Sequence, residues 1–284
     1  MGAFHAYDIR GRWNVDFDRG TVYKTGYFLP ELLDCRKVAV GRDMRLSSPE
    51  LHAALLKGLT DAGADVYDLG LATTPYVYYA TAAKGFSASV QITASHNPKD
   101  DNGLKVSREN ALPVGYDTGL GTIEKWILEG RPCIPVEEAA RGKVIPLDLR
   151  DEYLAFQRRY VGDYSGLRIC ADLSNGMSAL FVKDLLPSSV EYICDTPDGS
   201  FPNHEPNPLV PENTAMLREY VRDHGCDIGL IYDGDADRVM FVDERGEFIS
   251  PDLMIALMGH FFMEGTGTSP AARERAALKA AGRF

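Results

Sequence analysis

Short apolar runs that alternate with helix-start signals are the feature that most constrains the fold of this chain. In its first third, three runs have the length and composition of buried strands, at residues 37–41, 64–69 and 88–92. Ser48 and Thr73, each followed by a proline within two residues, predict helix starts between these runs, although Ser47 with Glu50 is an alternative cap. Strands that alternate with helices predict a parallel α/β architecture.

The same strand–loop–helix plan restarts after a segment rich in glycine and proline at residues 129–146. We expect a helix at 179–186 and strands at 167–171, 190–194, 227–231 and 239–242. Five prolines between residues 197 and 211 predict an extended segment, which we call the proline-rich loop. The pattern therefore predicts two tandem α/β domains, at residues 1–148 and 149–248.

Composition narrows the classes of partner. The chain has 284 residues, 45% of them apolar, which suffices for about two domains with their own cores. Its net charge of −11 argues against a nucleic-acid or anionic-membrane partner, whereas local Arg and Lys can still bind a small anion. The five cysteines form no C-x-x-C pair, and we find no signal peptide or apolar run of membrane-spanning length. We therefore expect reduced thiols and a cytoplasmic location.

A tight loop follows the strand predicted at 88–92. Residues 93–105 read T-A-S-H-N-P-K-D-D-N-G-L-K, and the N-P and N-G pairs are turn signals. The loop should present Ser95 and His96 at the carboxyl end of a strand, where α/β proteins place their chemistry. A Ser–His hydrolase dyad is not expected, because adjacent residues in extended chain seldom point toward each other.

A second loop, between the strands predicted at 227–231 and 239–242, carries three alternate aspartates. Asp233, Asp235 and Asp237 can direct their carboxylates into one pocket if the loop curls, and the Gly and Ala between them leave room for that. Three like charges so close together repel strongly and need a cation. Hard oxygen ligands with open positions suit Mg²⁺.

Two other interpretations of the aspartate loop compete with a magnesium site. One is a solvated acidic turn. The other is an EF-hand calcium loop, since Glu244 falls at the twelfth position counted from Asp233. However, the sixth position of an EF-hand should be glycine and is Arg238 here, and the flanking segments are predicted to be strands rather than helices.

Four segments of the chain resemble signatures of the α-D-phosphohexomutases, the family of phosphomannomutase and phosphoglucomutase. They are T-A-S-H-N-P with N-G-L-K at 93–105, D-G-D-A-D-R at 233–238, Y-D-I-R-G at 7–11, and G-S-F-P-N-H-E-P-N-P at 199–208. They occur in the family's order, and the resemblance spans residues 4–262. It implies two mixed-sheet α/β domains of the phosphohexomutase type, followed by the start of a third.

The resemblance also implies roles for particular residues. Ser95 would be the phosphorylated serine, and its phosphate would hold Mg²⁺ together with Asp233, Asp235 and Asp237. Arg10 and Arg238 would stabilise the phosphoryl group in transit. Lys105 and His96 are the candidates for moving the proton of the sugar hydroxyl. Family position favours Lys105, and His96 would mostly orient by a hydrogen bond. Tyr7, Arg10 and Lys105 would contact the substrate.

By resemblance, then, the chain is an intramolecular phosphotransferase that interconverts hexose 1-phosphate and hexose 6-phosphate. The family's cycle passes through a phosphoserine and a hexose 1,6-bisphosphate, and it mostly needs positioning and charge neutralisation. The expected cofactor is Mg²⁺ and the expected partners are hexose phosphates and the bisphosphate. The sequence does not distinguish between glucose, mannose and glucosamine phosphates.

The chain departs from the family pattern at its carboxyl end. A helix at 251–263 resembles the start of the family's third domain, whereas the Ala- and Arg-rich tail that follows does not resemble the family. We therefore interpret residues 249–284 as the truncated start of that domain, with an atypical tail. Such a chain is expected to be a poor mutase and to self-associate through the exposed apolar helix. The alternative function is a catalytically impaired fragment that only binds Mg²⁺ and phosphosugar.

Overall fold

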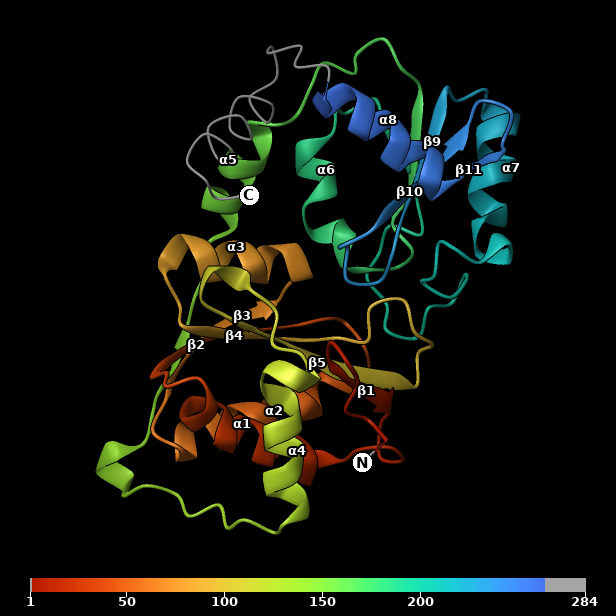
Figure 1. The fold of residues 1–284 in the computed structure, drawn as a ribbon. Coiled ribbons are helices and arrows are strands. Elements are labelled where there is room, and N and C mark those ends of the chain that lie inside the picture. The colour runs from red at the N-terminus through yellow and green to blue at the C-terminus, as the bar shows by residue number, and fades with distance from the viewer. Residues whose placement is uncertain (1, 264–284) are drawn as a thin grey trace.

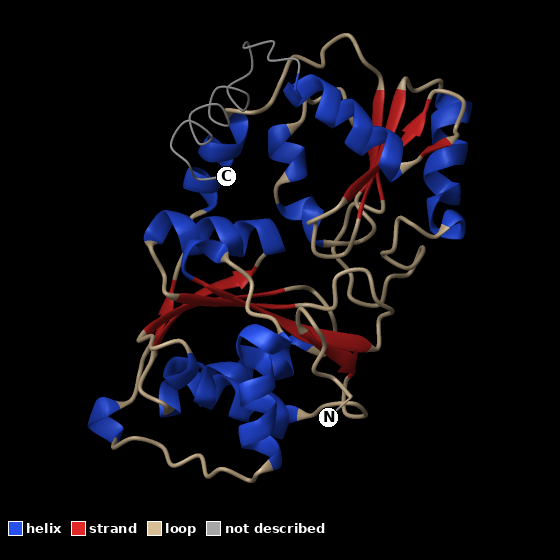
Figure 2. Ribbon diagram, in the orientation of Figure 1, coloured by secondary structure: helices blue, strands red, loops and turns tan. Residues whose placement is uncertain are grey.

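A six-stranded mixed sheet forms the centre of the first unit in the computed structural model, which describes residues 2–263 (Figures 1 and 2). Its strands are β1 (Ile9–Arg12), β2 (Lys37–Arg42), β3 (Asp65–Leu71), β4 (Ala88–Ile92), β5 (Asp101–Arg108) and β6 (Val144–Pro146). In the order β1-β5-β4-β2-β3-β6, strands β2, β3, β4 and β6 run parallel, whereas β5 is antiparallel to β1 and β4. The three predicted strands thus form the parallel centre, and β5 makes the sheet mixed.

Helices cover both faces of this sheet. They are α1 (Arg19–Leu32), α2 (Ser48–Asp61), α3 (Thr74–Lys84) and α4 (Gly121–Leu128), with short turns at η1 (Glu109–Ala111), η2 (Tyr116–Leu120) and η3 (Glu138–Ala140). Helices α1, α2 and α4 lie on one face, and α3 lies on the other, toward the second unit (Figure 1). The larger core of this unit packs Phe28 of α1 and Leu55 of α2 against Val38 and Val90 of the sheet.

The two predicted helix starts differ in their caps. Thr73 caps α3, because its Oγ1 accepts a hydrogen bond from the N–H of Tyr76 at 3.1 Å. Helix α2 begins at Ser48 and its N-cap is Ser47, so the predicted Ser48 cap is wrong. The side chain of Ser47 makes no capping hydrogen bond, so the alternative capping box with Glu50 does not form either. Ser48 instead donates its hydroxyl to Asp43, a fully buried carboxylate in the loop after β2 that needs donors.

A second mixed sheet, of five strands, forms the centre of the second unit. Its strands are β7 (Ile169–Asp172), β8 (Glu191–Ile193), β9 (Ile228–Tyr232), β10 (Val239–Asp243) and β11 (Phe248–Ile249), in the order β11-β10-β9-β7-β8. Strand β7 is parallel to β8 and β9, whereas β10 is antiparallel to β9 and β11. The fold class predicted for the two units, tandem mixed-sheet α/β domains, is confirmed.

The helices of the second unit are α5 (Arg150–Arg158), α6 (Val182–Leu185) and α7 (Ala215–His224), with turns at η4 (Met177–Leu180) and η5 (Pro211–Thr214). Helix α8 (Pro251–Met263) follows β11, in the segment that we interpret as the start of a third domain. Helices α6 and α7 contribute to separate cores of the sheet. The prediction of one helix at 179–186 is wrong, because η4 and α6 are separated by Phe181. The buried Phe181 ring packs against Tyr76 of α3 and Tyr153 of α5, so this break lies where the two units meet.

The loops after β4 and β9 face each other across the junction of the two units. Gly234, in the loop after β9, approaches the backbone after β4 so closely that a Cβ on it would lie 2.5 Å from the carbonyl oxygen of Ser95. The backbone N–H of Thr74, at the start of α3, donates to the carbonyl oxygen of Asp235 at 3.1 Å. These contacts place the two predicted loops in one cluster.

Helix α8 presents apolar side chains to solvent. Leu253, Ile255 and Leu257 are 65%, 68% and 60% exposed. The side chains of Phe261 and Phe262, which we expected on the same surface, and the tail at 264–284 lie outside the described residues. Among the helices of the described residues, none is long and apolar enough to cross a membrane.

Helices α1 and α2 cross at Gly26 and Gly58, and this close contact generates a first prediction. A Cβ on Gly58 would lie 2.1 Å from the carbonyl oxygen of Tyr23, so Gly58→Ala must push the helices apart. We expect it to lower the free energy of unfolding by about 1–3 kcal/mol, as overpacking does, measured by urea denaturation. Gly20→Ala, at an exposed position of α1, is the control and should not destabilise the protein. Equal stability of the two variants would contradict the close crossing.

Candidate active site

Ser95 lies three residues beyond the end of β4, in a backbone conformation that non-glycine residues seldom adopt. Its φ is 51°, and its side chain is fully buried. The Thr93 hydroxyl accepts the Ser95 N–H at 2.9 Å, which fixes the turn. The Ser95 Oγ donates to Asp233 Oδ2 at 2.8 Å and accepts from Arg238 Nη2 at 3.2 Å. The structure thus brings the predicted serine against the predicted aspartate loop.

The three aspartates converge as the spacing predicted. A carboxylate oxygen from each of Asp233, Asp235 and Asp237 lies within 4.8 Å of the other two. Asp233 and Asp235 are fully buried, and burial together with the two neighbouring carboxylates raises the pKa of Asp233 well above its usual range. The Oδ1 of Asp235 is buried without a hydrogen-bond partner. An orphaned buried acceptor among converging carboxylates fits a site for a hard cation such as Mg²⁺.

The EF-hand interpretation is wrong. The aspartate loop joins β9 to β10, which pair as an antiparallel hairpin, whereas an EF-hand loop joins two helices. The solvated acidic turn is also wrong for two of the three aspartates, because Asp233 and Asp235 are fully buried.

Lys105 comes from β5, opposite Gln91 of β4, and its ammonium lies between two of the aspartates. The Nζ donates to Asp235 Oδ2 and to Asp237 Oδ2, each at 2.6 Å. Burial opposes the charged amine, but the two carboxylates outweigh it and raise the pKa of Lys105. Burial likewise opposes the Asp235 carboxylate, yet Lys105 lowers the pKa of Asp235 to about 2. Lys105 is therefore protonated at this site when no substrate is bound.

His96 is neutral and faces Arg238 rather than the serine. Burial, followed by the charges of Arg238 and Arg10, lowers the pKa of His96 to about 4. Arg238 Nη2 donates to His96 Nδ1 at 2.7 Å, and because a guanidinium only donates, the ring proton is on Nε2. Ser95 Oγ is 3.5 Å from Nδ1 and donates to Asp233 instead. The structure therefore contains no Ser–His hydrolase dyad at this position.

Of the two predicted site residues near the N-terminus, Arg10 lies at the candidate site and Tyr7 does not. Arg10 donates from Nη1 to Asn97 Oδ1 at 3.2 Å, so it lies against the Ser95 loop, and its Nη2 pairs with Asp8. The buried Nε of Arg10 has no hydrogen-bond partner, which leaves a donor for an anionic ligand. Tyr7 is 81% exposed and makes no side-chain hydrogen bond to any of these residues.

Arg45 is a residue of this site that the sequence analysis did not find. Its side chain is fully buried in the loop after β2. Its Nη2 donates to the carbonyl oxygens of Ser95 and Asn97 at 2.8 and 2.7 Å, and its Nη1 to those of Pro98 and Asp101 at 2.6 and 3.0 Å. One guanidinium thus fixes four carbonyls of the Ser95 loop. A signal was available, since parallel neighbours β2 and β4 end at the same edge of the sheet.

Arg45 also contacts the second unit. Its Cζ lies 5.1 Å from the ring centroid of Phe201, in the proline-rich loop. A Cβ on Gly199 of that loop would lie 2.7 Å from the Arg45 Cα. Thr74 was also missed: its hydroxyl donates to Asp235 Oδ2 from the first turn of α3. No pattern in the sequence connects Thr74 with the aspartate loop.

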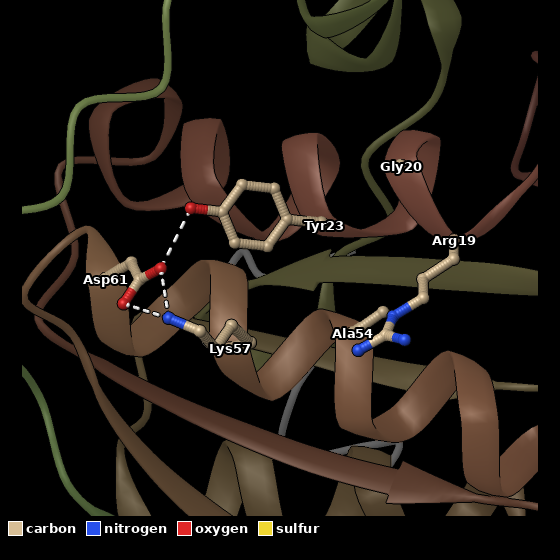
Figure 3. Close-up of a pocket in the computed structure, with 6 residues that line it drawn as sticks. All are labelled: Arg19, Gly20, Tyr23, Ala54, Lys57 and Asp61. Atoms are coloured by element: carbon tan, nitrogen blue, oxygen red, sulfur yellow. Dashed lines mark hydrogen bonds and ion pairs between the residues drawn. The ribbon is translucent and has the colours of Figure 1, made fainter.

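A separate pocket, between α1 and α2, does not include any predicted site residue (Figure 3). It has a volume of about 450 Å³ and is lined by Arg19, Gly20, Tyr23, Ala54, Lys57 and Asp61. The Tyr23 hydroxyl and the Lys57 ammonium both donate to Asp61, so most of its polar groups satisfy one another. The candidate site remains the cluster around Ser95.

Comparisons with known proteins agree with this geometry. Two family models match the chain: "Phosphoglucomutase/phosphomannomutase, alpha/beta/alpha domain I" over residues 1–131 and the corresponding domain II over residues 153–246. A phosphomannomutase of Salmonella typhimurium is 39% identical over 274 residues, which is 93% of this chain and 60% of that protein. Proteins named phosphohexose mutases, from Xanthomonas campestris, are 37% identical over 91% of this chain and 58% of their own length.

Solved structures show the same fold. A phosphoglucomutase/phosphomannomutase family protein from Burkholderia thailandensis superposes with a TM-score of 0.77 and 30% identity, over 90% of this chain and 58% of that one. A putative phosphomannomutase from Thermus thermophilus gives a TM-score of 0.79 at 24% identity, over 94% and 63%. The chain thus spans about 60% of the length of the relatives it matches.

The position of Arg45 generates a second prediction. Arg45→Met should lower the free energy of unfolding by about 3–5 kcal/mol, because it leaves the buried Asp43 carboxylate without its cation. The four backbone carbonyl oxygens that accept hydrogen bonds from Arg45 also lose their donor. Urea denaturation measures the change. Arg245→Met, which removes an exposed pair with Asp243, is the control and should change stability little. If the two variants unfold at the same urea concentration, Arg45 does not hold the loop.

Proposed function

The chain belongs to the phosphoglucomutase/phosphomannomutase family, and we therefore propose that it transfers a phosphoryl group between hexose phosphates and its own Ser95. The observation that carries this proposal is the position of the Ser95 Oγ, held between Asp233 and Arg238 beside three converging carboxylates. A nucleophile, an acceptor for its proton and a cation for the phosphoryl oxygens lie within hydrogen-bond distance of one another, as phosphoryl transfer requires.

We assign the metal to Asp233, Asp235 and Asp237. Their carboxylate oxygens converge, and the orphaned Oδ1 of Asp235 is available as a further acceptor. When bound, Mg²⁺ would neutralise charge on the phosphoryl oxygens beside Ser95.

The chain's own residues supply the remaining chemistry. When the Ser95 Oγ forms a bond to phosphorus, its proton passes to Asp233 Oδ2, which already accepts it at 2.8 Å. The phosphorus–oxygen bond to the sugar breaks at the same centre, and the sugar oxygen takes a proton from an acid of the site. Arg238, which donates to the Ser95 Oγ, and Arg10, with its free Nε, stabilise the transferring group.

Lys105 and His96 are the candidates for the sugar proton. Lys105 is an ammonium that can donate to the leaving sugar oxygen, and in reverse it accepts the proton again. Neutral His96 has its proton on Nε2 and can orient a hydroxyl or a phosphate oxygen by donating to it. We assign the proton transfer to Lys105 and an orienting hydrogen bond to His96.

The substrate class is hexose phosphates and hexose 1,6-bisphosphate. Relatives from Salmonella typhimurium and Escherichia coli are named phosphomannomutase, which favours mannose 1-phosphate as the first substrate to assay. A second candidate function is binding of Mg²⁺ and phosphosugar without turnover, for which the converging carboxylates and the unpartnered Nε of Arg10 would suffice. A coupled assay on mannose 1-phosphate and glucose 1-phosphate distinguishes the two.

Ser95 is predicted to take up the phosphoryl group. Incubation with hexose 1,6-bisphosphate that carries labelled phosphate should label the wild-type chain, and Ser95→Ala should take up none, because it lacks the nucleophilic oxygen. Mass spectrometry of peptides locates the label. Ser107→Ala, which removes a buried serine of the neighbouring strand β5, is the control and should label normally. Label of equal strength on the Ser95→Ala protein would falsify the assignment.

Asp235 is predicted to be a metal ligand. Asp235→Asn should weaken Mg²⁺ binding by roughly tenfold or more, since it removes a full negative charge from a buried cluster. Calorimetric titration measures the affinity. Asp243→Asn, at the last residue of β10, is the control and should bind as the wild type does. An unchanged affinity in Asp235→Asn would place the metal elsewhere.

A further inference from the structure

A second group of metal-ligating side chains lies in the second unit, apart from the aspartate loop. Asp172 ends β7, Cys194 directly follows β8, and His204 lies in the proline-rich loop. One ligand atom from each, namely a carboxylate oxygen, a thiol sulfur and a ring nitrogen, lies within 4.8 Å of the other two. The proposed function uses none of these residues.

The three side chains form a built and largely buried cluster. The side chains of Asp172 and His204 are 0% and 7% exposed, and His204 Nε2 is 3.1 Å from Asp172 Oδ2. That separation is shorter than the spacing of two ligands around a tetrahedral ion with bonds of about 2.0–2.3 Å, so a small movement admits the ion. Asp172 is buried, whereas Cys194 and His204 are partly exposed as whole residues, so the cluster lies near the protein surface.

The outer hydrogen bonds of the cluster are those that metal ligands usually have. His204 Nδ1 donates to the carbonyl oxygen of Glu205 at 2.9 Å, so Nε2 is the nitrogen that faces the cluster. The other oxygen of Asp172, Oδ1, accepts the N–H of Ser174 at 2.8 Å, which leaves Oδ2 for the cluster. Both ligating atoms are therefore oriented by bonds made on their far side.

The backbone at Cys194 is also held in an unusual conformation. Its φ is 47°, in the left-handed region that residues with a side chain seldom occupy. The carbonyl oxygen of Cys194 accepts the N–H of Asn175 at 2.7 Å, which fixes this turn at the end of β8. The sulfur thus lies beside the other two ligand atoms because the backbone is constrained there.

We propose that Asp172, Cys194 and His204 bind Zn²⁺, with the fourth position open to water or another ligand. Nitrogen, thiolate and carboxylate are the ligands of zinc sites, and a catalytic-type site has three protein ligands and one open position. Sulfur and nitrogen are poor ligands for Mg²⁺, so the cluster differs chemically from the aspartate loop.

The net charge of the cluster is the same with and without the bound ion. Without the ion, the Asp172 carboxylate pairs with a protonated His204 ring across 3.1 Å. Binding releases one proton from His204 Nε2 and one from the Cys194 thiol. Zn²⁺ with a carboxylate, a thiolate and a neutral imidazole then has no net charge, as the ion pair with a neutral thiol had.

The ion would pin the proline-rich loop to the ends of β7 and β8. Pro206 of that loop lies near Gly234, with its Cβ 3.4 Å from the position of a Cβ there, and Gly234 in turn contacts the Ser95 carbonyl oxygen. Occupancy of the zinc site would therefore stabilise the loop that lies against the candidate active site. The zinc site does not depend on phosphorylation of Ser95.

Cobalt substitution tests the proposal on the full chain. After treatment with a chelator, titration with Co²⁺ should produce a thiolate-to-cobalt charge-transfer absorption, which Zn²⁺ removes by competition and excess Mg²⁺ does not. Cys194→Ser should lose this absorption, and His204→Gln should weaken binding tenfold or more. The control is Cys133→Ser, which removes another half-buried cysteine and should behave as the wild type does. In dilute buffer, the wild type should release one more proton per metal than Cys194→Ser.

Three results would overturn the proposal. They are no charge-transfer absorption in the wild type, equal absorption in Cys194→Ser, or binding that Asp235→Asn abolishes while Cys194→Ser leaves it intact. The last result would place the metal on the aspartate loop. Circular dichroism of each chelated variant shows whether it is folded, and Cys194→Ser carries the decision if His204→Gln fails to fold.

Discussion

The hydrogen bond between Ser95 and Asp233 joins two loops from separate sheets, and the charges around it depend on both sheets being in place. Asp233 and Asp235 are fully buried and Asp237 lies beside them, an arrangement that repels itself unless cations are near. Lys105 and Arg238 supply positive charge from β5 and from the end of the aspartate loop. The site therefore exists only where the first and second units are docked.

Arg45 and the proline-rich loop make that docking specific. Arg45 donates hydrogen bonds to four carbonyl oxygens after β4, and the ring of Phe201, from the second unit, packs against its guanidinium. Phe181 performs a similar task at the other side of the junction, where it packs between α3 and α5. Arg45 contacts both the Ser95 carbonyl oxygen and the Phe201 ring. It therefore connects the conformation of the Ser95 loop to the packing of the two units.

The sequence predicted much of this fold because strand and helix signals are local. The parallel strands β2, β3 and β4 and the start of α3 at Thr73–Thr74 followed from apolar runs and start signals within a few residues. The prediction failed where a tertiary contact outweighed a local preference. Ser48 gives its hydroxyl to buried Asp43 instead of capping α2, and Phe181 interrupts a predicted helix to reach an aromatic core.

By itself, the sequence determined which residues could do the chemistry: a serine at a strand end, three alternating aspartates, and the lysine and arginines of the recognised motifs. Only the tertiary structure decided how they are held. Arg45 reaches Ser95 across 50 residues of chain, Thr74 reaches Asp235 across 161, and His204 reaches Asp172 across 32. No local pattern encodes such contacts, because they arise when strand ends from distant parts of the chain meet at one junction and bury polar groups that must then find partners.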